Sequence, residues 1–178
     1  MVFCRIQPWV NNAMTNFMLV VTFLGSQNFL VPANILLILY FLFVRENKKT
    51  AFKITTISVT SVIVMFSIKF ILRRERPLVP LISKVHGYSF PSGHTFTSVT
   101  FYGIIAFIVY KNVANPVLRW LIIILLAAFV FLVGFSRVYL RLHYASDVIA
   151  GFCLGIIWLL LAKWFLVKTH YSSLQENL

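Results

Sequence analysis

Long runs of apolar residues, separated by short polar segments, make up most of this chain. A helix needs about 20 mostly apolar residues to cross the hydrocarbon core of a bilayer. Five runs approach or reach that length: residues 29–44, 54–72, 95–110, 120–135 and 148–167. The pattern therefore predicts an all-α fold, a polytopic bundle of transmembrane helices.

A weaker stretch precedes these five, at residues 13–25. It is brief and carries Thr15, Asn16 and Thr22, so we expect an interfacial or partly inserted helix, with a true first span as the alternative. The expected total is five to six transmembrane helices. We expect one membrane-embedded domain over residues 1–178, with its core at 29–167 and the additional helix within 1–28.

Composition supports a membrane protein. Of the 178 residues, 60% are hydrophobic and 11% are charged, and the mean hydropathy is +0.90. An ordinary soluble domain is much less apolar. We therefore expect an integral membrane protein.

The basic residues, which give a formal net charge of +12, fall into two groups. The first group flanks the ends of the spans where the positive-inside rule expects cytoplasmic cations. It comprises Arg45, Lys48, Lys49, Lys53, Lys111, Arg119, Lys163 and Lys168. This placement argues against nucleic-acid binding. The second group falls on the opposite side, where that rule gives no reason for it: Lys69, Arg73, Arg74, Arg76, Lys84, Arg137 and Arg141.

Three polar segments carry nearly all the residues suited to phosphate chemistry. They are Lys69 with Arg76-Pro77, the run 91–94, and Ser136-Arg137 with His143 and Asp147 in the connection 136–147. The first and second segments are joined by a loop that does not cross the membrane. The chain then crosses the membrane twice before the third segment, so all three segments lie on the same face. We expect that face to be the non-cytoplasmic one, so that the three segments form one active site at the membrane edge.

The residue types in these segments suit a phosphoryl group. Lys69, Arg76 and Arg137 can surround its oxygens, with the arginines as bidentate donors and the lysine as a point charge. Ser92 precedes an apolar run and can cap a helix whose first N–H groups bind the same anion. Gly93 allows the backbone to approach closely.

His143 and Asp147 are four residues apart at the expected start of a helix, so their side chains are predicted to share one face. A carboxylate bound to one ring nitrogen fixes the tautomer and leaves the other nitrogen as a nucleophile or base. His94 places a second imidazole on the same side of the membrane.

A metal site is the alternative use of these side chains, because His86, His94, His143 and Asp147 could all bind zinc. A divalent cation would lie among Lys69, Arg76 and Arg137 with one carboxylate to offset the repulsion, at a cost of several kcal/mol per contact. Magnesium would need carboxylate ligands that are absent here. We expect metal-independent chemistry without a cofactor.

The segments Lys-x6-Arg-Pro, Pro-Ser-Gly-His and Ser-Arg-x5-His-x3-Asp resemble the three-part signature of the type 2 phosphatidic acid phosphatase superfamily. These are membrane lipid phosphatases, related to vanadium haloperoxidases and bacterial acid phosphatases. The motifs are intact in order and internal spacing, and the resemblance covers about residues 29–167. Members commonly have six core helices, whereas five spans are clear here.

The resemblance implies a role for each motif residue. His143 would attack phosphorus and form a phosphohistidine, with Asp147 holding its ring. His94 would protonate the leaving alkoxide and then deprotonate a water. The phosphoryl oxygens would be held by Lys69, Arg76, Ser92, Gly93 and Arg137.

We therefore expect a lipid phosphatase of a bacterial plasma membrane, acting on phosphatidylglycerophosphate, phosphatidate or a polyprenyl pyrophosphate. The expected partners are this lipid substrate and membrane lipids, with no nucleic acid and no obligatory protein partner. Phosphotransfer to another acceptor and anion binding or transport are the alternatives. For six further polar residues two interpretations stay open, a solvated interfacial face or a second phosphate or headgroup site. These residues are Arg73, Arg74, Glu75, Lys84, His86 and Arg141.

Overall fold

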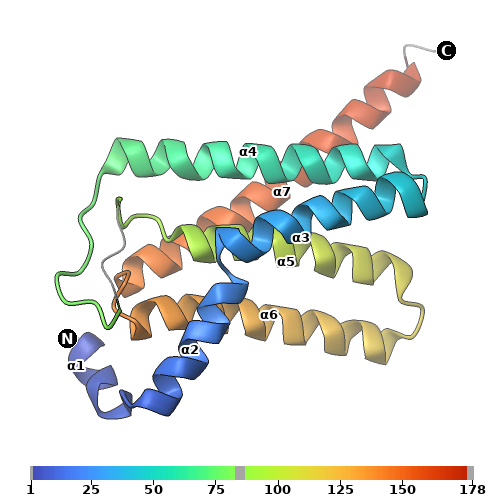
Figure 1. The fold of residues 1–178 in the computed structure, drawn as a ribbon. Coiled ribbons are helices and arrows are strands. Elements are labelled where there is room, and N and C mark those ends of the chain that lie inside the picture. Colours follow the sequence, from blue (N-terminus) through green and yellow to red (C-terminus); the bar gives the residue numbers. More distant parts are fainter. Residues whose placement is uncertain (1, 83–86, 176–178) are drawn as a thin grey trace.

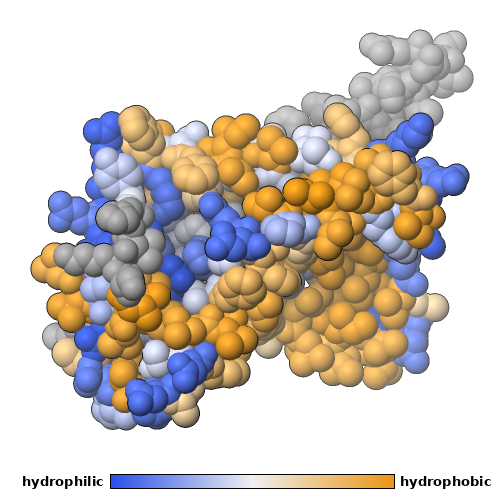
Figure 2. All heavy atoms as spheres, in the orientation of Figure 1, coloured by the Kyte–Doolittle hydropathy of each residue, from blue (hydrophilic) through white to orange (hydrophobic). Residues whose placement is uncertain are grey.

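The computed structural model describes residues 2–82 and 87–175, and within that part of the chain the secondary structure is entirely helical. Five stretches are long and apolar enough to cross a membrane: Asn12–Val44, Lys48–Leu72, Gly93–Asn112, Pro116–Tyr139 and Ala145–Trp164. The predicted helical membrane bundle is confirmed. Figure 2 shows hydrophobic residues along most of the length of the helices, with hydrophilic residues gathered at both ends.

Helix α5 (Gly93–Asn112) occupies the centre of the bundle and packs against α3 (Gln27–Leu39), α4 (Lys48–Leu72), α6 (Pro116–Tyr139) and α7 (Ala145–Gln175) (Figure 1). Glycines bring α7 close to α5. A Cβ on Gly151 would lie 2.9 Å from the carbonyl oxygen of Ser92, and one on Gly155 would lie 2.8 Å from the Cβ of Val99. The glycine pair in α7 therefore packs inside the bundle.

The helices extend beyond the apolar runs that predicted them. α4 begins at Lys48, where the Asn47 side chain accepts a hydrogen bond from Thr50 N (2.9 Å). α6 continues to Tyr139, so Ser136 and Arg137 lie in its last turn and the prediction that they belong to a connection is wrong. Hydropathy detects the segment in the hydrocarbon, whereas a helix continues into the polar interface for as long as its backbone remains paired.

The N-terminal part comprises α1 (Val2–Ile6), the short helix η1 (Gln7–Trp9) and α2 (Asn12–Leu24), followed by α3 and the π-helical turn η2 (Tyr40–Val44). The chain turns between α2 and α3 (Figure 1), at Gly25. A Cβ on Gly25 would lie 2.4 Å from Val133 Cγ1, so a larger residue would push this turn away from α6.

Helix α2 packs on the end of α6, where Met18 meets Tyr139, Leu140 and Leu142 in one buried cluster. With 13 residues it is about 20 Å long, which is short of the roughly 30 Å hydrocarbon core. Whether it is an interfacial or partly inserted helix or a true first span stays a prediction, as does the single-domain assignment.

Candidate active site

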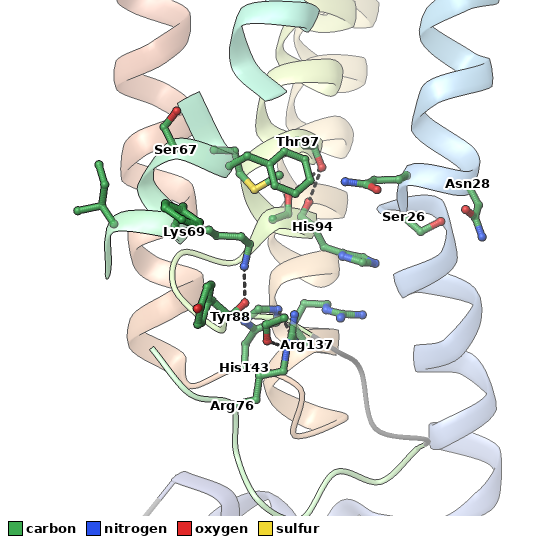
Figure 3. Close-up of a pocket in the computed structure, with 17 residues that line it drawn as sticks. Ser26, Asn28, Ser67, Lys69, Arg76, Tyr88, His94, Thr97, Arg137 and His143 are labelled. Atoms are coloured by element: carbon green, nitrogen blue, oxygen red, sulfur yellow. Dashed lines mark hydrogen bonds between the residues drawn. The ribbon is translucent and has the colours of Figure 1, made fainter. Parts of the chain in front are cut away.

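A cavity of about 1060 Å³ lies at the end of the bundle where α4 ends and α5 begins. Six of the predicted site residues line it: Lys69, Arg76, Gly93, His94, Arg137 and His143. Figure 3 shows the cations, His94 and His143 beside one another, with Ser26, the N-cap of α3, and Asn28 of α3 on the facing side. The three polar segments therefore meet at one face, as span parity predicts. Ser92 and Asp147 are fully buried beside this cavity.

Backbone carbonyls hold two of the three cations. Lys69 Nζ donates to Tyr88 O (2.6 Å), and Arg76 donates to Gly87 O and Leu142 O (both 2.9 Å). Carbonyl acceptors carry no net charge, so they orient these groups without neutralising them. Both side chains keep further donors for an anion.

Arg137 is held by helix α2. Its NH1 donates to Thr22 Oγ1 of α2 at 2.6 Å, and its Nε has no partner within the described part of the chain. Only 3% of Arg137 is exposed. Burying a charged group is costly without hydrogen bonds, so the contact with Thr22 helps to keep the guanidinium at the cavity.

His143 lies between a carboxylate and a cation. Its Nδ1 is 3.6 Å from Asp147 Oδ2 and 3.4 Å from Ser89 Oγ, while its Nε2 is 3.2 Å from Arg76 NH1. A guanidinium has donors and no acceptor, so this contact assigns the proton to Nδ1 and the lone pair to Nε2. The histidine therefore presents an unprotonated nitrogen beside the guanidinium of Arg76.

The pairing of His143 with Asp147 differs from the predicted one. α7 begins at Ala145, so His143 lies in the turn before the helix and the expected shared helical face is wrong. The turn still brings the side chains together, because Tyr144 N donates to Asp147 Oδ2 (2.9 Å). Ser89 Oγ also donates to Oδ2.

Arg74 completes the surroundings of Asp147. Its NH1 lies 2.8 Å from Asp147 Oδ1 and 2.8 Å from Ser146 Oγ, and its guanidinium stacks over the Tyr144 ring at 4.4 Å. The structure thus uses Arg74 to bind the carboxylate, which neither of the two open interpretations included. Lys84 and His86, left open with it, lie outside the described residues.

The second segment forms the start of α5. Ser92 occupies the N-cap position and its N–H donates to the Asp147 carbonyl (2.9 Å), but its hydroxyl accepts from Thr95 Oγ1 (3.0 Å) and caps no backbone group. The expected side-chain cap is therefore wrong. Unpaired N–H groups in the first helical turn favour an anion at this position, next to His94.

Burial and charge set the protonation of His143. Burial lowers the pKa of His143 to about 4; the interaction with Asp147 opposes this shift, and the positive charges of Arg137 and Arg76 increase it. Burial also lowers the pKa of Arg76, against the attraction of Asp147. At neutral pH, His143 is therefore uncharged and its Nε2 carries the lone pair that a nucleophile or base requires.

Metal ligation has little to build on at this site. Within residues 2–82 and 87–175, His, Cys, Asp and Glu side chains form no group of three or more that could hold a metal ion. The absence of a cofactor remains a prediction, which the chelator experiment described below addresses.

Sequence reasoning missed two contact residues, Thr22 and Ser89, and it missed that Arg74 binds Asp147. Thr22 was noted as a polar residue in an apolar stretch, and such residues in membrane helices usually face the protein interior. Ser89 lies two residues before the second segment, so its position gave a usable signal. The partner of Arg74 depends on a tertiary contact with α7 that no local pattern reports.

The chain is similar to known membrane phosphatases. Residues 50–171 match the PAP2 superfamily. Phosphatidylglycerophosphatase B of Bacillus subtilis (strain 168) is 32% identical over 163 residues, which cover 89% of this chain and 76% of that protein. The crystal structure of a transmembrane PAP2 type phosphatidylglycerolphosphate phosphatase from Bacillus subtilis superposes with a TM-score of 0.83 at 28% identity, over 94% of this chain and 83% of that one. Aquifex aeolicus LpxE shares the fold, with a TM-score of 0.66 at 24% identity over 90% and 91% of the two chains.

Replacing Thr22 by valine should weaken binding of orthovanadate, a phosphate analogue, by about tenfold, because a hydrogen bond to a charged group contributes roughly 1.5–3 kcal/mol. Calorimetry in detergent would measure the affinity. Thr22→Ser should restore it. Thr15→Val is the matched control, since Thr15 lies on the same helix and its hydroxyl contacts Tyr139 (3.2 Å) instead. Equal losses in Thr22→Val and Thr15→Val would show that helix packing, and not Arg137, is what the substitution disturbs.

The imidazole of His143 should stay neutral far into the acidic range. In ¹⁵N-histidine NMR spectra of the protein in micelles, the signal that His143→Asn removes should titrate near pH 4, below the ordinary value of 6.5. The sign follows from burial, which disfavours the charged form of a histidine and so lowers its pKa. A midpoint at or above 6.5 would contradict the lowered pKa of His143.

Proposed function

Because this chain belongs to the PAP2 superfamily and is a lipid phosphate hydrolase, we propose that it removes the terminal phosphate of a membrane lipid through a phosphohistidine intermediate. The substrate class is phosphatidylglycerophosphate, phosphatidate or a polyprenyl pyrophosphate. One observation carries the proposal: neutral His143 presents Nε2 beside Arg76, with its Nδ1 facing Asp147, in the cavity that also contains His94.

The first step of the proposed reaction is attack on phosphorus. Nε2 of His143 forms a bond to phosphorus as the bond to the leaving oxygen breaks, and Asp147 stabilises the positive charge that develops on the ring. His94 gives a proton to the leaving alkoxide. The products are the dephosphorylated lipid and a phosphohistidine.

The second step is hydrolysis. His94, now neutral, takes a proton from a water whose oxygen attacks phosphorus, and the bond from phosphorus to Nε2 breaks. Inorganic phosphate leaves and both histidines return to their starting states. Positioned cations supply most of the stabilisation in phosphoryl transfer, which is the role we assign to Lys69, Arg76 and Arg137.

The start of α5 provides the remaining phosphate contacts in this proposal. Gly93 lines the cavity and offers its backbone. The hydroxyl of Ser92 accepts a hydrogen bond from Thr95, so it would have to rotate to reach a phosphoryl oxygen. The backbone N–H groups in the first turn of α5 need no such change, because Ser92 is the N-cap at which that helix begins.

An adjoining groove suits the hydrocarbon of a lipid substrate. It has a volume of about 450 Å³, lies between α3 and α4, and shares Gln27, Phe66 and Thr97 with the catalytic cavity. A phosphate at His143 would therefore lie at the mouth of a mostly apolar channel that can take acyl or prenyl chains. This arrangement favours an amphiphilic substrate over a soluble phosphate ester.

We assign the site to the non-cytoplasmic face of a bacterial plasma membrane. Lys48, Lys49 and Lys53 lie at the start of α4, at the end of the bundle remote from Lys69. Cations of this kind mark the cytoplasmic side under the positive-inside rule. The active site would then open at the opposite surface.

His143→Asn should lower phosphate release by at least about a thousandfold, because it removes the nucleophile. Labelled lipid phosphate, quenched in alkali, should yield phosphohistidine with wild type and none with the variant. The chelator EDTA should leave wild-type turnover intact. Strong inhibition by EDTA would refute the metal-free mechanism, and an undiminished phosphoenzyme in the variant would mean that another residue is the nucleophile.

His94→Asn should slow substrates according to their leaving group. General acid catalysis contributes about 10²–10⁴-fold when the leaving group is an alkoxide, and much less when it departs without a proton. The rate of phosphoenzyme formation from a lipid phosphate should therefore fall by a far larger factor than the rate from p-nitrophenyl phosphate, whereas the later hydrolysis step, in which His94 acts as the base, is common to both. Equal losses in the rate of phosphoenzyme formation would exclude His94 as the acid.

A further inference from the structure

A second apolar groove lies at the opposite end of the bundle. It has a volume of about 580 Å³ and lies between α4, α5 and α7, with Ile57, Ile104 and Leu160 among its walls. Lys53 is 16 residues before Lys69 along α4, so this groove is about 24 Å from the catalytic cavity along the helix. Its size is within the usual range for ligand sites.

Three lysines from three different helices line this groove: Lys53 of α4, Lys111 of α5 and Lys163 of α7. In the described residues, ion pairs form around Asp147 and none involves these lysines. Lys111 lies near the Phe107 ring, at 5.8 Å from its centroid. Three like charges around one hollow repel one another unless an anion lies between them.

A smaller, more polar cavity adjoins the groove. It measures about 390 Å³, shares Thr50 and Lys111 with the groove, and adds Arg45 and Asn47. The two hollows thus form an apolar channel with a cationic, hydrogen-bonding mouth. That combination matches a molecule with a hydrocarbon chain and an anionic headgroup.

The positive-inside rule does not by itself explain why three lysines line one groove. It requires cations near the helix end and is satisfied equally by Lys48 and Lys49, which line neither hollow. A zwitterionic lipid would bring its own cation toward the lysines. An anionic phospholipid places its phosphate among them and its chain along α4 and α7, which is the recognised form of basic lipid pockets between membrane helices.

We propose that this groove is a binding site for an anionic phospholipid of the leaflet at that end of the bundle, separate from the catalytic cavity. The lysines bind the headgroup phosphate, and the apolar walls hold an acyl chain. A lipid bound here stabilises the contacts between α4, α5 and α7 by mass action, since it binds the folded state. This proposal is independent of the proposed reaction.

The test compares two double variants with equal loss of charge. Lys53→Gln/Lys163→Gln removes two groove lysines, and Lys48→Gln/Lys49→Gln removes two that face neither hollow. Native mass spectrometry of protein in dodecyl maltoside would count bound dioleoylphosphatidylserine, with dioleoylphosphatidylcholine as the chain-matched comparison. Melting temperatures without added lipid check that each variant is folded.

Wild type and Lys48→Gln/Lys49→Gln should prefer the serine lipid over the choline lipid, and the groove variant should lose at least about tenfold of that preference. Lys53→Arg/Lys163→Arg should retain it, which also covers the case in which the glutamine variant does not fold. Inorganic phosphate should not displace the lipid. Equal losses in the two glutamine variants, no headgroup preference in wild type, or displacement by inorganic phosphate would each overturn the proposal.

Discussion

Asp147 is the point at which the separate segments of the active site are joined. Its carboxylate accepts hydrogen bonds from Arg74, Ser89 and the Tyr144 backbone, and it faces the ring of His143. Its own carbonyl accepts from Ser92 N, which fixes α7 to the start of α5. One buried acidic residue therefore positions His143 and the start of α5 together. A buried carboxylate persists when its oxygens are fully hydrogen-bonded, and here the partners come from segments far apart in the chain.

The site around Asp147 has an excess of positive charge. Arg74 is paired with the carboxylate, whereas Lys69, Arg76 and Arg137 are held by carbonyls or a hydroxyl and keep their charge. Such an arrangement is costly in a protein interior until an anion occupies it. Arg137, with only 3% of its surface exposed, is the most enclosed of the three, whereas Lys69 and Arg76 are half-buried. A bound phosphate would supply the missing negative charge, and the excess of positive charge adds to burial, the larger cause, in lowering the pKa of His143.

Hydropathy and motif spacing predicted the helical bundle and the residues that line one face of it, because both depend on local composition. The five spans follow from the thickness of the hydrocarbon, and parity alone places Lys69, His94 and His143 on one side. The errors arose where tertiary contacts decide the outcome. His143 lies in a turn before α7, Ser92 bonds to Thr95, and Arg74 pairs with Asp147 across the site. No periodicity in the sequence encodes which partner a buried polar group will find.

The hydrogen bond from Arg137 to Thr22 shows that the site depends on a residue outside the region that matches the superfamily. The part of the chain that matches the superfamily covers residues 50–171 and holds every motif residue, yet it leaves out α2 and α3. Thr22, which orients Arg137, and Gln27 and Asn28, which line the cavity, all precede that boundary. A fragment cut to the matching region would retain the motifs while losing one wall of the cavity and the support of a cation. The region that matches the superfamily is therefore smaller than the part of the chain that forms the cavity and supports its cations.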